Sequence, residues 1–188
     1  STQPTAVGVR PTSQKVLTAD ARFVKVTVGF AHFCALDDAG AVWCGGGNAD
    51  GELGTGDTVN HPDEMLKVGG LGKAIDVSAG VNNTCAVLQS GEVWCWGTDS
   101  PMTSAKLLFE SLVPIRIDNL TGLSAVHNGR NFMCGLEAAA VDCWGSNIMG
   151  QLGVTSDILG GRFWGLVKHP SGPPTSIGAG MFSACGTF

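Results

Sequence analysis

Charged residues are scarce in this sequence. Asp, Glu, Lys and Arg make up 14% of the 188 residues, and the formal net charge is −5. The 11 lysines and arginines are scattered and form no basic stripe. Because contacts to phosphates need clustered cations, we expect no nucleic acid among the partners of this protein. The composition predicts a mildly acidic, soluble surface.

Long hydrophobic runs are also missing. Hydrophobic residues make up 44% of the chain, but no stretch approaches the roughly 18 apolar residues of a membrane helix. We therefore expect no membrane span. The first residues, Ser1-Thr2-Gln3-Pro4, lack the basic region and apolar core of a signal peptide, although a processed precursor would begin in the same way.

The patterns typical of catalysis are absent as well. The sequence has no Gly-x-Ser-x-Gly elbow, and the glycines at 45–47 precede no helix, which argues against a phosphate loop. It has no Cys-x-x-Cys pattern that would indicate a metal site. The four histidines fall at unrelated positions: His32, His61, His127 and His169. We expect no enzyme, no catalytic or metal-binding residues and no cofactor.

Glycine and cysteine, in contrast, are abundant and periodic. The chain has 28 glycines and 7 cysteines. Four glycines each stand five residues before a cysteine, at steps of 51, 49 and 51 residues: Gly29, Gly80, Gly129 and Gly180. A fixed period of this size indicates a propeller or a solenoid.

Each repeat contains the pattern of a β-hairpin. In residues 85–97, two short apolar runs flank a three-residue loop that ends in Gly91. This register places Cys85 directly opposite Cys95, which is close enough for a disulfide. The first hairpin has the same loop with Gly40. The third, residues 134–143, is one residue shorter and lacks a turn glycine, so we expect a different loop there.

The cysteines therefore form three expected disulfides within hairpins: Cys34–Cys44, Cys85–Cys95 and Cys134–Cys143. Buried free thiols are the alternative, since cysteine packs well as a small hydrophobe. In the chain-entropy model each disulfide contributes roughly 2.7 kcal/mol. Cys185 is left over and needs a partner in another strand or another chain. This cysteine usage predicts an extracellular, cell-surface or other oxidising compartment.

The repeats predict an all-β chain with four short strands in each unit of about 50 residues. We place the units at residues 23–73, 74–122 and 123–176, with a partial fourth at 177–188. Residues 1–22 form an N-terminal segment that could supply the outer strand of a blade. One short helix is expected within residues 104–112.

The repeated motifs resemble a known family. The pattern Gly-x-x-x-x-Cys-Ala-Leu, followed by Gly-x-Val-Trp-Cys-Trp-Gly and Gly-Gln-Leu-Gly, is similar to the repeats of the regulator of chromosome condensation family. The resemblance implies a β-propeller, commonly of seven four-stranded blades. This chain would supply about three blades and the start of a fourth. The paired cysteines resemble the secreted, cysteine-paired branch of the family, but its members differ too much in function for the fold to transfer one.

Seven blades at this period would need roughly 350 residues. The sequence leaves three explanations open. The chain is a fragment of a larger propeller, or another copy completes the ring, or the blades form an open arc capped by neighbours.

Candidate contact and modification residues lie mostly outside the repeat core. Asn82 and Asn119 stand in Asn-x-Thr sequons and are candidate glycosylation sites. Trp164 lies outside the repeat pattern and is a candidate contact residue. The loops after the hairpins vary most, at residues 50–62, 98–114 and 155–174.

We therefore expect a non-catalytic protein-interaction or structural assembly module, extracellular or surface-exposed. Its partners would be proteins, including another copy or a larger assembly. One alternative is an intracellular regulatory propeller of the nucleotide-exchange or chromatin type. Another is a carbohydrate-binding module, for which an exposed Trp164 would be required.

Overall fold

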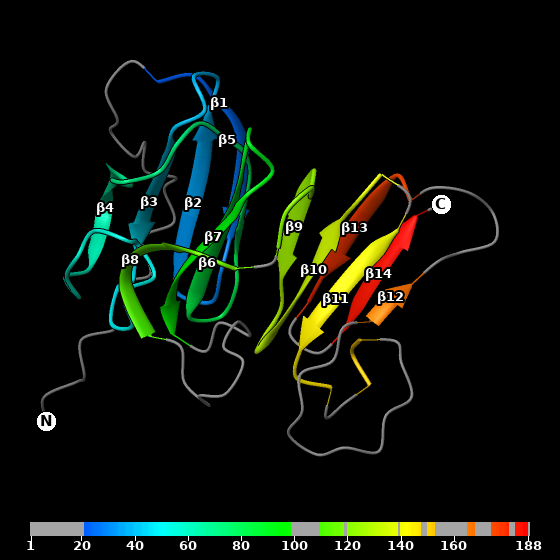
Figure 1. Ribbon diagram of the computed structural model, residues 1–188. Coiled ribbons are helices and arrows are strands. Elements are labelled where there is room, and N and C mark those ends of the chain that lie inside the picture. Colours follow the sequence, from blue (N-terminus) through cyan, green and yellow to red (C-terminus); the bar gives the residue numbers. More distant parts are fainter. Residues whose placement is uncertain are drawn as a thin grey trace, which may run out of the picture.

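The computed structural model describes residues 21–98, 110–118, 120–138, 140–147, 150–152, 165–167, 174–180 and 183–187. Every regular element among them is a β-strand. The strands form three four-stranded antiparallel sheets and one two-stranded sheet, each built from consecutive segments of the chain (Figure 1). The fold is thus a partial β-propeller with three blades and the first hairpin of a fourth.

The first blade contains β1 (Phe23–Val28), β2 (His32–Asp37), β3 (Val42–Gly46) and β4 (His61–Lys67). The second contains β5 (Ala74–Ala79), β6 (Asn83–Leu88), β7 (Val93–Thr98) and β8 (Glu110–Arg116). The third contains β9 (Ala125–Asn128), β10 (Phe132–Leu136), β11 (Val141–Gly145) and β12 (Gly165–Val167). The last pair is β13 (Ser176–Ala179) and β14 (Ala184–Thr187).

The hairpins have the register that the turn glycines predict. Val87 lies opposite Val93, and Cys85 lies opposite Cys95. Gly91, the third loop residue, has a φ of 81°, a left-handed conformation that glycine adopts without strain.

The third hairpin uses a different loop, as expected. The backbone N–H of Glu137 donates to the carbonyl of Ala140 at 2.9 Å, so only two residues lie between these partners. A two-residue loop needs no glycine at a third position, which accounts for the shorter spacing of these cysteines.

The core lies between neighbouring blades. One buried cluster joins residues of the first and second blades, including Leu36, Val77 and Trp96. A second joins the second and third blades, including Val87 and Val126, and a third extends from the third blade to Ile177 on β13. Each blade is therefore stabilised by packing against its neighbours, as in other repeat architectures.

The prediction of a helix within residues 104–112 is wrong for the part of this segment that the structure describes. Residues 110–112 belong to β8, which pairs with β7, and residues 104–109 lie outside the described residues. The ladder between β7 and β8 is irregular between Cys95 and Gly97, which leaves Pro114 outside the regular pairing. Proline is tolerated at such an irregularity in an outer strand, so this apolar segment continues as a strand. No helix in the described part of the chain has the length and apolar character needed to cross a membrane.

Candidate interaction surfaces

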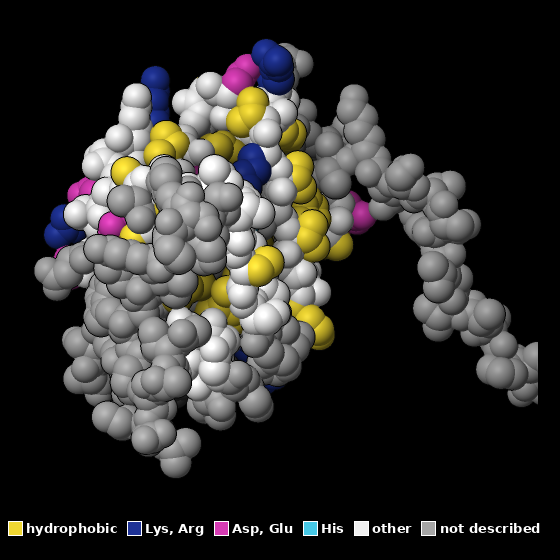
Figure 2. Space-filling model, turned by 90° about the vertical axis from the view of Figure 1, so that its right-hand side faces the viewer, with side chains coloured by type: hydrophobic (Ala, Val, Ile, Leu, Met, Phe, Trp, Pro, Cys, Tyr) yellow, Lys and Arg dark blue, Asp and Glu magenta, His cyan; other side chains and the backbone are white. Residues whose placement is uncertain are grey.

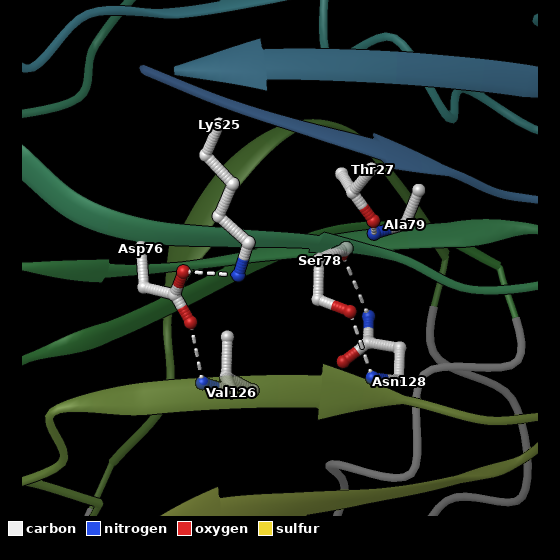
Figure 3. Close-up of polar contacts among 7 residues, drawn as sticks. All are labelled: Lys25, Thr27, Asp76, Ser78, Ala79, Val126 and Asn128. Carbon is white, nitrogen blue, oxygen red and sulfur yellow. Dashed lines mark hydrogen bonds and ion pairs between the residues drawn. The ribbon is translucent and has the colours of Figure 1, made fainter. Parts of the chain in front are cut away.

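The polar residues of the first strands join one blade to the next. The hydroxyl of Thr27 on β1 accepts a hydrogen bond from the backbone N–H of Ala79 on β5, at 3.0 Å. One repeat later, the hydroxyl of Ser78 accepts the N–H of Asn128 on β9, at 2.9 Å (Figure 3). The same contact therefore recurs at equivalent positions, and it satisfies a backbone donor that would otherwise be buried without a partner.

Asp76 connects three blades. One carboxylate oxygen forms an ion pair with Lys25 of the first blade, and the other accepts the backbone N–H of Val126 in the third blade at 2.8 Å (Figure 3). The Asp76 side chain is only 7% exposed. A buried carboxylate is tolerated when it is paired and hydrogen-bonded in this way, so its role here is to hold the blades together.

The periodic glycines let the blades approach closely. A methyl group at Gly129 would lie 2.6 Å from the carbonyl oxygen of Gly180, and one at Gly80 would lie 3.1 Å from that of Gly129. A methyl group at Gly29 would overlap the carbonyl of Gly80. None of these three glycines needs a left-handed backbone, because their φ values are not positive. At each of the three glycines a methyl group would also overlap the side chain three residues later, which is His32, Asn83 or Phe132. Close approach of the next blade and of this side chain together require glycine here.

The Gly-x-Leu-Gly turn of the first repeat connects the first blade to the second. Leu53 in this turn is fully buried, and its N–H donates to the side-chain oxygen of Asn48 at 2.9 Å. The carbonyl of Glu52 accepts hydrogen bonds from Thr84 at 2.9 Å and from Trp96 at 2.7 Å. The turn therefore lies across the second blade.

The third repeat has the same local arrangement. Leu152 is 1% exposed, and its N–H donates to the Asn147 side chain at 2.9 Å. The second repeat has no Gly-x-Leu-Gly sequence at this position.

His32 lies inside the joint between the first two blades. It is 2% exposed, and its Nε2 lies 2.8 Å from the hydroxyl of Thr84. Because Thr84 donates its own hydrogen to Glu52, His32 must donate from Nε2, which fixes the neutral tautomer. Burial lowers the pKa of His32 to about 4, against the smaller opposing effect of a backbone hydrogen bond at Asn83. This histidine serves the structure in its uncharged form.

The structure joins the cysteines as expected. Disulfides connect Cys34 to Cys44, Cys85 to Cys95 and Cys134 to Cys143, with Cα atoms 4.1, 4.1 and 4.0 Å apart. The sulfur of Cys85 lies 3.9 Å from Met133 in the following blade, so this disulfide also packs in a joint. Cys185 is exposed and unbonded on β14. This leftover thiol stands at the position that Cys34, Cys85 and Cys134 occupy in the complete hairpins.

The structure describes only some of the other candidate site residues. Trp164 and Asn119 lie outside the described residues. Asn82 is half-buried, and the threonine of its sequon, Thr84, is fully buried in the joint. Of the variable loops, only residues 50–62 are described throughout.

Among the described residues, one carboxylate has a pKa that is shifted upward. Asp142, half-buried on β11, has its pKa raised to about 6 by burial and by the nearby carboxylate of Glu137. Among the described residues, no three His, Cys, Asp or Glu side chains are placed to hold a metal ion. In the view of Figure 2, hydrophobic side chains form a band along the right-hand side of the described surface, and most charged side chains lie at its upper and left edges.

One surface was not recognised from the sequence. Four apolar side chains alternate along and just after β1 and are largely exposed: Val24 at 59%, Val26 at 63%, Val28 at 72% and Phe30 at 76%. We call these four residues the β1 face. The alternation of Val24, Val26 and Val28 with Lys25 and Thr27 indicates a strand with one apolar side. The sequence alone gives no indication that this side is left uncovered.

Comparisons with known proteins identify the class of fold. The family model of the regulator of chromosome condensation (RCC1) repeat matches residues 74–100. The human regulator of chromosome condensation is 30% identical over 146 residues, which is 74% of this chain and 34% of that protein.

Two solved structures are also similar. The match to human WBSCR16 has a TM-score of 0.74 at 20% identity and covers 89% of this chain and 45% of the WBSCR16 chain. The match to Prp20p from Saccharomyces cerevisiae has a TM-score of 0.67 at 21% identity and covers 85% of this chain and 40% of the Prp20p chain. The chain is therefore a β-propeller segment that spans less than half the length of these proteins.

The second repeat matches the regulator of chromosome condensation repeat over residues 74–100, and the first and third blades have the same order of four strands. The resemblance read from the sequence motifs is confirmed, and the three disulfides fit the cysteine-paired branch of the family.

Proposed function

We propose that this chain is a non-catalytic protein-interaction module that works in an oxidising compartment. The observation that carries this proposal is the β1 face. A largely exposed row of three valines and a phenylalanine is the kind of surface that marks a protein contact. The buried polar side chains, in contrast, are used between blades and inside turns.

The fold supports a scaffold role. Repeated blades provide rigid strands, and the loops between them can vary without changing the core. Prp20p, a protein with the same fold, binds Gsp1p and histones, so a propeller of this kind can have protein partners. In this chain the loops at 50–62, 98–114 and 155–174 are the second candidate contact surface.

The cysteines support the choice of compartment. Three disulfides in 188 residues would not persist under cytosolic reducing conditions, whereas extracellular or cell-surface proteins keep them. An intracellular regulatory propeller would carry these cysteines as free thiols. The redox state of the protein from its native source therefore separates the two settings.

Photo-crosslinking tests the interaction role. We would replace Phe30 with p-benzoyl-phenylalanine, irradiate the protein in its native source and identify crosslinked proteins by mass spectrometry. We expect protein adducts from position 30 that are missing from the same substitution at Ser90, an exposed residue in a hairpin loop. Equal labelling at both positions, or no protein adduct at Phe30, would contradict the proposal.

A further inference from the structure

The three complete blades differ at one buried position. His32, Asn83 and Phe132 are each the first residue of the second strand of their blade, and each is at most 2% exposed. They lie in the first, second and third joint, where a joint is the contact between one blade and the next. Histidine changes its charge in mild acid, whereas asparagine and phenylalanine do not. Of these three joints, only the first therefore has a titratable side chain at this position.

The contacts of His32 suit only the uncharged ring. Its Nε2 donates to the Thr84 hydroxyl at 2.8 Å, and that hydroxyl donates to the Glu52 carbonyl at 2.9 Å. The other ring nitrogen, Nδ1, is buried and has no hydrogen-bond partner among the described atoms. A proton at Nδ1 would create a buried charge and a buried donor without an acceptor, which costs free energy. Acid therefore favours an open form of the joint, in which water reaches the ring.

The charged groups on the elements around His32 do not offset this cost. Burial has the largest effect on the pKa of His32, which it lowers to about 4, and the backbone of Asn83 opposes it only in part. The neighbouring charged side chains have other partners: Glu52 accepts the N–H of the exposed Asp50 in the turn, Asp57 accepts Thr55 beyond it, Asp76 on β5 pairs with Lys25 on β1, Asp37 at the far end of β2 accepts Trp43, and His61 pairs with Glu64 on β4.

The Gly-x-Leu-Gly turn of the first repeat, residues 47–54, is bound to the same network. The Glu52 carbonyl in this turn accepts hydrogen bonds from Thr84 and from the Trp96 indole, and Leu53 is buried in the cluster of the first joint. Thr84 thus connects the turn directly to His32. An opening of the joint at His32 would therefore break the contacts that hold the turn on the second blade.

We propose that the first joint is an acid-sensitive latch. Uncharged His32 keeps the turn docked on the second blade near neutral pH, and protonation of His32 releases it. The latch lies between two complete blades of this chain and requires no partner, so it extends beyond the proposed interaction role. Because the turn leads into the loop of residues 50–62, its release would also change the shape of that candidate contact surface.

Hydrogen exchange measured by NMR tests the latch through two protons that cross neighbouring joints. The Trp96 indole N–H reports on the first joint through its bond to Glu52, and the Asn128 backbone N–H reports on the second through its bond to Ser78 (Figure 3). An open first joint returns the pKa of His32 to about 6.5, against about 4 in the closed joint. Opening at Trp96 should therefore increase about 20-fold between pH 7 and pH 5, after correction for intrinsic exchange rates.

The second joint should respond far less over the same range. His127, the neighbour of Asn128, is only half-buried, so it can take up a proton without opening of the second joint. The protection of the Asn128 N–H should therefore stay nearly constant between pH 7 and pH 5.

Two histidine variants identify the responsible group. His32→Asn gives the first blade the residue that the second blade has at position 83, and it should abolish the pH response at Trp96. His61→Asn is the matched control: the His61 side chain is 20% exposed and pairs with Glu64 on β4, so this variant should keep the full response. Circular dichroism at pH 7 verifies the folding of both variants. The comparison of Trp96 with Asn128 in the parent still decides if His32→Asn does not fold.

Unchanged opening at Trp96 between pH 7 and pH 5 would overturn the proposal. An equal increase at Asn128 would overturn it as well, because acid would then loosen the blades in general and not the first joint. A response of full size in His32→Asn would exclude His32 as the group that takes up the proton. None of these outcomes affects crosslinking at position 30, so the latch and the interaction role can fail independently.

Discussion

The indole N–H of Trp96, on β7, donates a hydrogen bond to the backbone carbonyl of Glu52, in the turn that follows β3. The distance is 2.7 Å, and the two residues belong to neighbouring blades. Trp96 is also fully buried in the cluster between these blades. The contact explains how a turn of one repeat is fixed on the next repeat.

Replacement of this tryptophan should loosen the first joint. Trp96→Phe removes the donor and leaves a small cavity, while Thr84 still donates to the same carbonyl. We expect the free energy of unfolding to fall by about 2 kcal/mol. Urea denaturation monitored by circular dichroism measures the change. An unchanged midpoint would mean that the turn is not held by this hydrogen bond.

The disulfides can be counted by mass and by thiol labelling. The native protein should gain about six hydrogens on reduction, as three disulfides open. One thiol, that of Cys185, should react with iodoacetamide before reduction, and seven should react afterwards. A protein from its native source with seven reactive thiols before reduction would remove both the disulfides and the oxidising compartment.

His32 should make the stability depend on pH. Its pKa is about 4 in the folded protein and about 6.5 in the unfolded chain, so the unfolded chain binds more protons between these values. The stability that comes from neutral His32 is therefore present above pH 6.5 and is lost as the pH falls toward 4. The loss should amount to about 3 kcal/mol.

The test compares the parent chain with His32→Asn, since asparagine occupies the equivalent position 83 in the second blade. Between pH 7 and pH 4, the urea midpoint should fall further for the parent chain than for the variant. Other groups that titrate in this range affect both proteins alike, and their effect cancels in the comparison. Equal pH dependence in the two proteins would contradict the burial of a neutral histidine.

Gly129 should not tolerate a side chain. Gly129→Ala would place a methyl group 2.6 Å from the Gly180 carbonyl and against the ring of Phe132, so the fourth hairpin must move away. We expect a loss of stability of about 1–3 kcal/mol, as for other overpacked sites. Gly69→Ala is the control, because no atom lies within 4 Å of that position. Similar urea midpoints for the two variants would show that close approach is not what requires glycine at 129.

The sequence predicted the local structure well where the repeats match. The hairpin register followed from the loop length and the turn glycine at 91, and the opposed positions of Cys85 and Cys95 followed from that register. The periodic glycines indicated repeats, but their role emerged only when the distance between Gly129 and Gly180 was known. Close approach between blades is a tertiary property that no local pattern contains.

Other features escaped prediction for physical reasons. Residues 110–112 were expected at the end of a short helix, and a short segment of mixed polar and apolar residues such as 104–112 suits either a helix or a strand. Pairing with β7 decides the outcome. The exposure of Val26 and Val28 was missed because the same alternation, in the second and third repeats, marks a buried face. Only the arrangement of the blades distinguishes the two cases.

All three disulfides close within a single hairpin, between cysteines 9 or 10 residues apart. Native pairing is therefore available as soon as one hairpin has been synthesised, whereas pairing between different hairpins must close a much longer loop. Loop closure is faster and entropically cheaper over short separations. Oxidative folding of this chain should thus proceed hairpin by hairpin during synthesis, with little need for a disulfide isomerase. The addition or loss of a whole repeat would leave the pairing of the remaining cysteines unchanged.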